Sequence, residues 1–381
     1  MEMPKPRDME IIMPCLPDDI AVSCLARLPR RTRAVARCVS RSWNAALREP
    51  HRIESLRLFL RIPPEPWVFV GLQNTECYPA FLQATEEFTR WLLIDPRELR
   101  AVVLRNPLAG TSADLDLRSA AGGGRILLPD LPDHRRQGFR SYVTEIFRWD
   151  ALGFAPGIFE ESRKGFACAG AGDFVYFAGG EQAERSACRY DAAGDRWEAL
   201  PDMTTQRINC AGVVMDGKFF VLGGFRHYAP GFTETHGSAE FFDAATGKWS
   251  LLPGFFANGL RHSEESNRSR PAVAVVDGRL YAMQSYSNEI MEYDGRKLQG
   301  WRPMGYAGGD AERRSYCVKY ELLGVGSELW AIEYAMGKSV SVYLCKPGNG
   351  RGESQAPEWS RVKISGTEGF DNVLTCTTLS V

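Results

Sequence analysis

The chain has 381 residues, enough for one large domain or two smaller ones, and 44% of them are apolar. Its 46 Lys and Arg residues nearly balance its 47 Asp and Glu residues, so the formal net charge is −1 at pH 7. This balance excludes a general electrostatic attraction to nucleic acid or to a membrane surface.

Residues 1–14 form an N-terminal tail without the features of a targeting signal. They lack the basic region followed by an apolar core that marks a secretory signal. No apolar stretch in the chain approaches the roughly 18 residues that a membrane span needs. The ten cysteines show no Cys-x-x-Cys spacing, which argues against a zinc site or a disulfide framework. We therefore expect no metal or cofactor, and a reducing compartment, the cytoplasm or the nucleus.

A helical period of about 3.6 residues governs the segment from Leu16 to Pro50. It predicts three short helices within residues 15–60, with Pro17 and two acidic residues at the start of the first. Leu28-Pro29 closes that first helix, and the third stops before Pro50. A core this small is marginal by itself, so its exposed apolar positions would need a partner.

The sequence of this segment, LPDDIAVSCLARLPRRTRAVARCVSRSWNAALREP, resembles an F-box over the whole length of that motif. The resemblance implies docking on a Skp-type adaptor, and through it on cullin. The implied adaptor-binding residues are Leu16, Pro17, Ile20, Leu25, Leu28, Pro29, Val39 and Trp43. Arg33 departs from the family pattern, because many F-boxes carry an apolar residue near this position. The alternative is a helical cap for the first strand of the domain that follows.

Seven arginines lie between residues 27 and 48, against few acids. They are Arg27, Arg30, Arg31, Arg33, Arg37, Arg41 and Arg48. A basic helical surface can bind nucleic acid, but no base-reading motif or aromatic stacking platform accompanies these residues. We therefore expect no nucleic-acid partner, and a basic face that is either solvated or in contact with an acidic protein.

Strands dominate residues 61–381. Trp67–Val70, Phe88–Asp95 and Arg125–Pro132 are expected to be neighbours in a first small sheet, with Thr111–Gly124 as a Gly- and Ala-rich loop between them. Residues Gly138–Ile158 carry apolar runs that are either a degenerate sheet or a long excursion.

Two stretches, 163–203 and 205–253, then repeat one pattern. Each has an apolar strand ending in a Gly pair (Gly179-Gly180, Gly223-Gly224), then Tyr/Phe-Asp, then Trp six residues after that Asp (Trp197, Trp249). The Gly pairs lie 44 residues apart, a period typical of propellers. This order resembles kelch repeats. Weaker copies follow at 271–301 and 316–364, so the resemblance implies a mainly β fold, a kelch-type propeller of five to six blades. The last strand, from Asn372, is expected to complete the first blade and so close the ring.

Two long connections are expected on one face of the propeller, because each connection in an up-and-down sheet reverses direction. Both are rich in aromatic residues and arginine, the types that dominate binding hot spots. The predicted target-binding residues are Phe225, Arg226, His227, Tyr228, Phe232, Phe255, Phe256, Arg261 and His262. The alternative is that these loops pack on one another and bind nothing.

No catalytic pattern is expected. The Gly pairs are not followed by Gly-Lys-Ser/Thr, and His227 and His236 lack further ligands for a metal. A copper oxidase of the galactose oxidase type is the rival enzyme class, and its ligand set is not found. An F-box followed by kelch repeats resembles the plant-rich F-box/kelch family. That resemblance implies a non-catalytic, substrate-recognition subunit of an SCF (Skp–cullin–F-box) ubiquitin ligase that binds a protein target. The alternative is a kelch scaffold without a ligase role.

Overall fold

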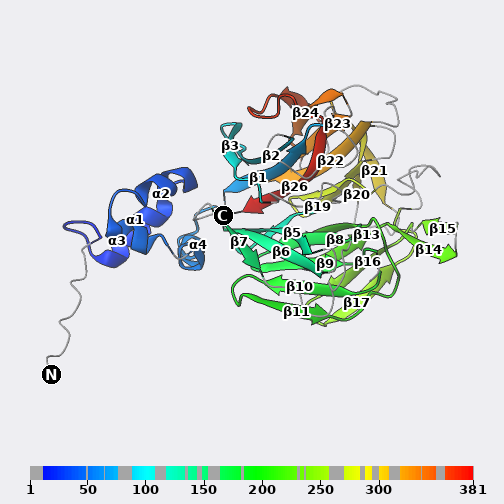
Figure 1. The fold of residues 1–381 in the computed structure, drawn as a ribbon, viewed down its shortest axis with the longest axis horizontal. Helices are drawn as coiled ribbons and strands as arrows, with labels where there is room; N and C mark the ends of the chain where they lie inside the picture. The colour runs from blue at the N-terminus through cyan, green and yellow to red at the C-terminus, as the bar shows by residue number, and fades with distance from the viewer. Residues whose placement is uncertain are drawn as a thin grey trace.

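The computed structural model has helices at its N-terminus and small β-sheets in the remainder (Figure 1). It describes residues 12–380 except 49, 64, 76–87, 108–116, 134–135, 144–147, 153–163, 182–183, 230–231, 236, 257–269, 284–287, 294–299, 309–317, 336 and 349–356.

The helical part contains one helix more than the three expected. Its helices are α1 (Asp18–Arg27), α2 (Arg30–Ala36), α3 (Arg41–Ala46) and α4 (Pro50–Phe59). Pro17 and Pro29 precede α1 and α2 as their N-cap residues. Ser40 caps α3, since its hydroxyl accepts a hydrogen bond from the Trp43 amide at 3.1 Å. Leu25 and Leu47 form the centre of a small core that Ile53 of α4 completes, which is why the fourth helix belongs to this domain.

The described strands form six four-stranded antiparallel blades and one two-stranded hairpin, which confirms the propeller. Blade 1 consists of β26 (Asn372–Ser380), β1 (Pro66–Gln73), β2 (Thr89–Asp95) and β3 (Arg100–Leu104), and blade 2 of β4 (Ala120–Gly122), β5 (Arg125–Asp133), β6 (Arg136–Val143) and β7 (Arg148–Leu152). Blade 3 consists of β8 (Ala167–Ala171), β9 (Phe174–Ala178), β10 (Ala187–Asp191) and β11 (Arg196–Leu200), and blade 4 of β12 (Ala211–Met215), β13 (Lys218–Leu222), β16 (Ala239–Asp243) and β17 (Lys248–Leu252). Blade 5 consists of β18 (Val273–Val276), β19 (Arg279–Met283), β20 (Glu289–Tyr293) and β21 (Trp301–Tyr306), and blade 6 of β22 (Val318–Val325), β23 (Glu328–Ala335), β24 (Lys338–Cys345) and β25 (Ser360–Val362).

The ring closes through its last strand, as the sequence predicted. Strand β26 pairs antiparallel with β1, from Pro66 opposite Ser380 to Gln73 opposite Asn372. The first strands of the blades, β26, β4, β8, β12, β18 and β22, each contact the next around the axis, and β22 contacts β26. First and last segments of the propeller therefore share one blade, which leaves the ring without an open end.

The prediction for the first sheet was wrong for one of its three strands. Arg125–Asp133 belongs to blade 2 with β6 and β7, so the segment Gly138–Ile158 contains half of a true blade in its described residues. The expected Thr111–Gly124 loop contains β4, the inner strand of that blade. Alanine and glycine are poor strand formers, and they occur here because the inner strands lie very close together. A Cβ atom built on Gly170 of β8 would lie 1.6 Å from the carbonyl oxygen of Ala121 in β4.

The repeated Tyr/Phe-Asp and Trp positions pack within and between blades. Tyr190 lies opposite Trp197 across the β10–β11 pair, with ring centroids 5.2 Å apart. Trp197 also reaches Phe139 of blade 2 at 4.9 Å. Trp249 in blade 4 donates its indole N–H to the carbonyl oxygen of Pro201, which follows blade 3, at 2.7 Å. The tryptophans therefore join neighbouring blades, as expected from their spacing.

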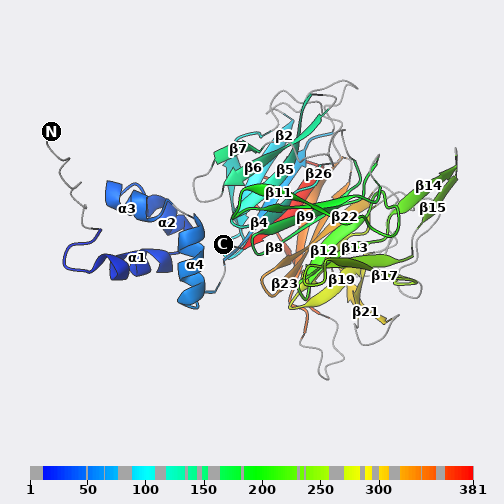
Figure 2. The same cartoon turned by 90° about the horizontal axis from the view of Figure 1, so that it is seen from below.

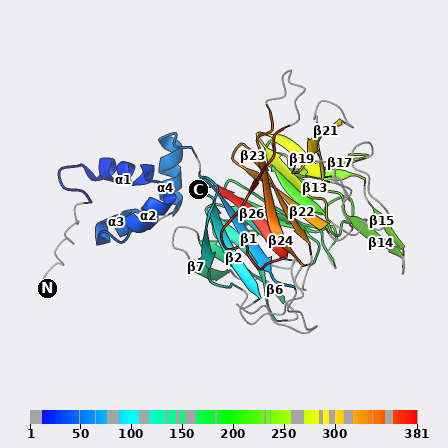
Figure 3. The same ribbon diagram turned by 90° about the horizontal axis from the view of Figure 1, so that it is seen from above.

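The helices and the longest described insertion lie at opposite ends of the molecule. The insertion is a hairpin of β14 (Phe225–Ala229) and β15 (Phe232–Thr235) between β13 and β16. The chain enters the propeller from α4 at Pro66, the start of β1, which is the second strand of blade 1, whereas the hairpin follows the end of β13, the second strand of blade 4. Figures 2 and 3 show α1–α4 on one side of the propeller and β14–β15 projecting from the other.

Candidate docking surfaces

Five of the eight predicted adaptor-binding residues are exposed on the helical domain. Leu16 and Ile20 are 40% and 47% exposed, and Val39 is 63% exposed. Pro17 and Pro29 are also exposed, each at the start of a helix. Solvent-exposed aliphatic side chains on so small a domain are the features that a protein partner would cover.

The other three predicted adaptor-binding residues belong wholly or partly to the helical core. Leu25 is fully buried, so it shapes the domain and presents no surface. Leu28 and Trp43 are half-buried and pack against the same core. The Trp43 indole N–H donates to the carbonyl oxygen of Ile12 at 2.6 Å, which ties α3 to the residues before α1.

The predicted basic face is smaller than the arginine count suggests. Arg30 and Arg33 are 2% and 1% exposed, so the structure removes them from any solvated surface. Arg33, the residue that departs from the F-box pattern, donates to the carbonyl oxygen of Leu28 at 3.0 Å. Its long side chain thus fills an interior position, where its guanidinium binds backbone.

On the propeller, the aromatic connection after Gly224 is a β-hairpin and not a loop. Phe225 pairs with Thr235 and His227 with Thr233, with an irregularity before Ala229 pairs with Phe232. At its base, Phe225 also forms a bridge with Ile208 through two backbone hydrogen bonds of 2.8 and 2.9 Å.

The predicted target-binding residues divide into three groups. Phe225, Phe255 and Phe256 are buried, the last two against Trp301 between blades 4 and 5, so their expected place on the binding surface is corrected. Arg226 is half-buried at the base of the hairpin. His227 and Tyr228 belong to strand β14 of the hairpin, and Phe232 belongs to β15. Arg261 and His262 lie outside the described residues.

The two predicted connections do meet on one face. The amide of Phe256 donates a hydrogen bond of 2.9 Å to the carbonyl oxygen of Gly237, which closes the hairpin segment. The aromatic pair after β17 therefore supports the hairpin from within the core.

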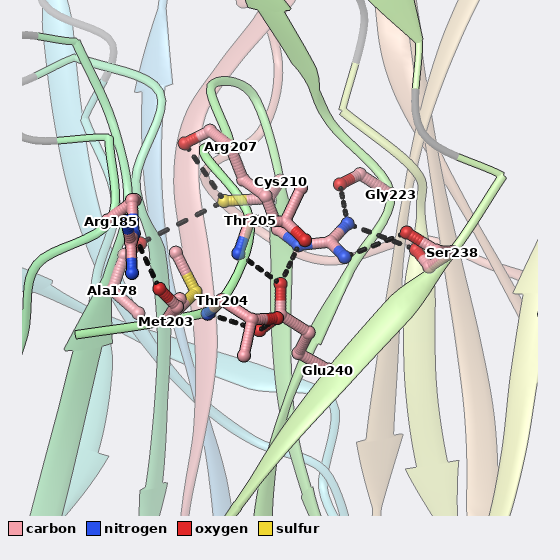
Figure 4. A network of polar contacts seen from close by, with 10 residues as sticks. All are labelled: Ala178, Arg185, Met203, Thr204, Thr205, Arg207, Cys210, Gly223, Ser238 and Glu240. Carbon is pink, nitrogen blue, oxygen red and sulfur yellow. Dashed lines mark hydrogen bonds and ion pairs between the residues drawn. The ribbon is translucent and has the colours of Figure 1, made fainter. Parts of the chain in front are cut away.

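A buried polar network that sequence reasoning missed fixes the base of this hairpin (Figure 4). Arg207 and Glu240 are both fully buried, and the guanidinium Nε lies 3.1 Å from the Glu240 carboxylate. Arg207 also donates to the carbonyl oxygens of Gly223 at 2.7 Å and Ser238 at 3.1 Å, which flank the hairpin. One side chain thereby holds together both ends of the inserted segment.

The same carboxylate holds the preceding loop. Glu240 accepts hydrogen bonds from the Thr204 and Thr205 amides at 2.8 and 3.1 Å. Burial lowers the pKa of Arg207, and the negative charge of Glu240 partly offsets that effect. Burial raises the pKa of the Cys210 thiol beside them, and this thiol donates to the carbonyl oxygen of Gly165 at 3.8 Å. A charged pair so enclosed is a structural clamp.

Neither a metal centre nor a membrane helix is found in the described part of the chain. No three His, Cys, Asp or Glu side chains among those residues are grouped to hold a metal. None of the described helices is both long enough and apolar enough to cross a membrane.

Comparison with known proteins assigns both parts of the chain. Residues 13–54 match the F-box domain, and residues 206–255, which contain blade 4 and the hairpin, match the Kelch motif. Among solved structures, the one titled "Structure of YjhT" aligns with a TM-score of 0.40 and 15% identity over 54% of this chain and 66% of that one.

Similar Arabidopsis thaliana proteins combine the same two parts. F-box/kelch-repeat protein At1g80440 is 29% identical over 363 residues, 90% of this chain and 95% of its own length. F-box/kelch-repeat protein SKIP20 is 28% identical over 70% of this chain and 71% of its own length. F-box/kelch-repeat protein At1g26930 is 27% identical over 78% and 68%. These matches cover both the helices and the propeller, so the chain has an F-box domain and a kelch motif and is similar over most of its length to plant F-box/kelch-repeat proteins.

Proposed function

We propose that the protein is the substrate-recognition subunit of an SCF-type ubiquitin ligase. Its helical domain binds a Skp-type adaptor, which connects it to cullin, and its propeller binds a protein target for ubiquitination and degradation. The proposed compartment is the cytoplasm or the nucleus. The chain contributes proximity and no reacting group: a tethered target meets the ubiquitin-conjugating enzyme at high effective concentration.

The observation that carries this proposal is the exposure of aliphatic side chains on the matched F-box. Leu16 precedes α1 and Ile20 lies in its first turn, whereas Val35 lies at the end of α2 and Val39 in the turn that follows it. Val35, which the sequence analysis did not select, is 65% exposed. A folded domain gains nothing from keeping four such residues in water, whereas an adaptor surface would bury them.

The experiment is a pull-down of purified Skp-type adaptor by the full chain and by a Leu16→Ala/Pro17→Ala variant. We expect the native chain to retain the adaptor and the variant to lose most of it. The matched control is Val102→Ala/Val103→Ala, which also removes two adjacent exposed apolar side chains, but from β3 of the propeller. The control should bind like the native chain, and failure of the native chain to bind would refute the ligase role.

The second candidate function is a kelch scaffold that binds protein without any ligase. The projecting hairpin favours a binding role in either case, because it lies at the end of the molecule away from the helices. Proximity labelling with the full chain and with a chain lacking residues 15–60, under proteasome inhibition, separates the two functions. A ligase subunit accumulates ubiquitinated neighbours only when the helical domain is present, and a scaffold shows the same neighbours with both chains.

A further inference from the structure

The junction between the helical domain and the propeller is built around a buried arginine. Arg30, the first residue of α2, is 2% exposed, and its guanidinium carbon lies 5.2 Å from the ring centroid of Trp67 in β1. This is a cation–π contact across the boundary of the two domains. Arg30 therefore joins the F-box helices to blade 1 by side-chain packing, in addition to the peptide chain.

The contact continues into blade 2. Trp67 packs in one cluster with Tyr142 of β6, and Tyr142 lies 5.0 Å from Trp149 of β7. Burial raises the pKa of Tyr142 to about 12, and the nearby positive charge of Arg30 acts in the opposite direction. The arginine of the helical domain thus faces aromatic side chains from two blades at once.

The connecting segment is fastened as well. One carboxylate oxygen of Glu65 accepts a hydrogen bond of 3.0 Å from the Arg30 amide. The other oxygen forms an ion pair of 3.0 Å with the Arg57 guanidinium. The two side chains of that ion pair are 13% and 4% exposed. A carboxylate with two such partners cannot move without breaking charge-assisted bonds.

Arg57 of α4 completes the junction. Its guanidinium also donates to the carbonyl oxygens of Ala26 at 2.8 Å and Pro63 at 3.3 Å. It therefore ties the end of α1, the helix α4 and the connecting segment together. A connecting segment held by this many hydrogen bonds and an ion pair is expected to be rigid and not a flexible hinge.

We propose that Arg30 and Glu65 are positioning residues that lock the helical domain on blades 1 and 2. This inference rests on the proposed ligase function for its purpose: the chain would act as a rigid spacer that holds the hairpin face at one distance from the adaptor. The set of lysines within reach of ubiquitin transfer then depends on the junction, independently of how tightly adaptor or target binds.

Small-angle X-ray scattering of the full chain tests the lock without any partner. The variants are Arg30→Ala, which removes the cation from Trp67, and Glu65→Gln, which keeps an acceptor for the Arg30 amide but loses the charge that pairs with Arg57. The matched control is Arg302→Ala, which removes a surface ion pair of 2.8 Å to Glu292 in blade 5. We expect a larger radius of gyration and a longer maximum dimension in both junction variants, and no change in the control.

Unchanged scattering in both junction variants would overturn the proposal. Circular dichroism shows whether each variant is folded. If Arg30→Ala loses its structure, the milder Glu65→Gln variant decides, because its side chain keeps the shape of the glutamate.

In a reconstituted ligase, the pattern of ubiquitinated lysines distinguishes a positioning role of the junction from a role in stability alone. In the native complex we expect ubiquitin on a narrow set of propeller lysines, mapped by peptide mass spectrometry, and a broader set in the junction variants at unchanged adaptor affinity. An identical lysine pattern in native and variant chains would count against positioning. Failure of the native chain to bind the adaptor would contradict the proposed function while the scattering result still tested the lock.

Discussion

Small residues set how closely the inner strands of the propeller approach one another. Gly170 of β8, Gly212 of β12 and Gly324 of β22 each lie where a Cβ atom would come within 1.6 to 2.8 Å of a carbonyl oxygen on the neighbouring blade. The obstructing atoms are backbone, which cannot turn aside as a flexible side chain would. Glycine is therefore needed at these positions, because a larger residue would push the inner strands apart and widen the ring.

Gly170→Ala tests this at a single position. The added methyl group would meet Ala121 of β4 and force blades 2 and 3 apart, so we expect a loss of about 1–3 kcal/mol or more in the free energy of unfolding. Urea denaturation provides the measurement. Gly348→Ala is the matched control, since a Cβ there meets nothing within 4 Å. A Gly170→Ala variant as stable as the control would show that the inner strands can move apart freely.

At the scale of elements, the clamp at the base of the β14–β15 hairpin shows how a fixed arm is built on a blade. The Arg207 guanidinium binds the carbonyl oxygens on both sides of the insertion, and the equally buried Glu240 carboxylate neutralises its charge. Buried ion pairs contribute little net stability, but breaking one leaves an uncompensated charge inside the protein. The pair therefore favours one geometry at the base of the hairpin.

Glu240→Ala should lower the free energy of unfolding by about 3–5 kcal/mol, because it leaves the buried positive charge of Arg207 without its negative partner. It also removes the acceptor for the Thr204 and Thr205 amides. Hydrogen exchange should accelerate in β14 and β15 before it does in the four strands of blade 4. Glu198→Ala breaks a partly exposed pair with Arg189 and should cost only about 0–1 kcal/mol. Equal effects of the two substitutions would contradict a special role for the buried clamp.

Features that repeat along the chain can be predicted from its sequence, whereas features set by distant neighbours in the fold cannot. The Gly pairs and the Trp six residues after Asp could be predicted, because they repeat in blades 3 and 4 and do one packing task. Strand β4 could not, since Ala120-Ala121-Gly122 has no strand propensity and is defined only by its neighbours in the ring. Nor could the burial of Arg30 or of Phe255, because single-residue preference places arginine outside and says nothing of which aromatic residue a distant blade will cover.

The docking surfaces were predictable to different degrees for a similar reason. Helical spacing separates exposed Leu16 and Ile20 from buried Leu25 only once the fourth helix is known to cover the core. Arg207 and Glu240 carry no local signal, since 33 residues separate them and their partners are mostly backbone atoms. Order along the chain identifies a family, whereas the contacts that orient a surface arise only on folding.

For the whole molecule, ring closure depends on how β26 is held at its start. Asp371 precedes that strand, is buried, and accepts hydrogen bonds from the amides of Thr75 after β1 and Gly337 in blade 6 at 2.8 and 2.9 Å. Burial alone would raise the pKa of Asp371, but the hydrogen bonds from Thr75 and Gly337 more than offset this effect, so its pKa is lowered. One carboxylate thus joins the closing strand to blades 1 and 6.

The sign of the pH dependence follows from that lowered pKa. The carboxylate is bound more tightly in the folded state, so its contribution to stability is fully present above the unfolded value of about 3.9 and is lost as the pH falls through the folded pKa. Asp371→Asn should therefore reduce the free energy of unfolding by about 1–3 kcal/mol at neutral pH. The difference from the native chain should narrow as the pH falls below about 3.9, where Asp371 takes up a proton in the unfolded chain before it does in the folded one. Thermal unfolding between pH 3 and pH 7 measures this, with exposed Asp202→Asn as the control. A stability difference that stayed constant across this range would mean that the charge of Asp371 plays no part in closing the ring.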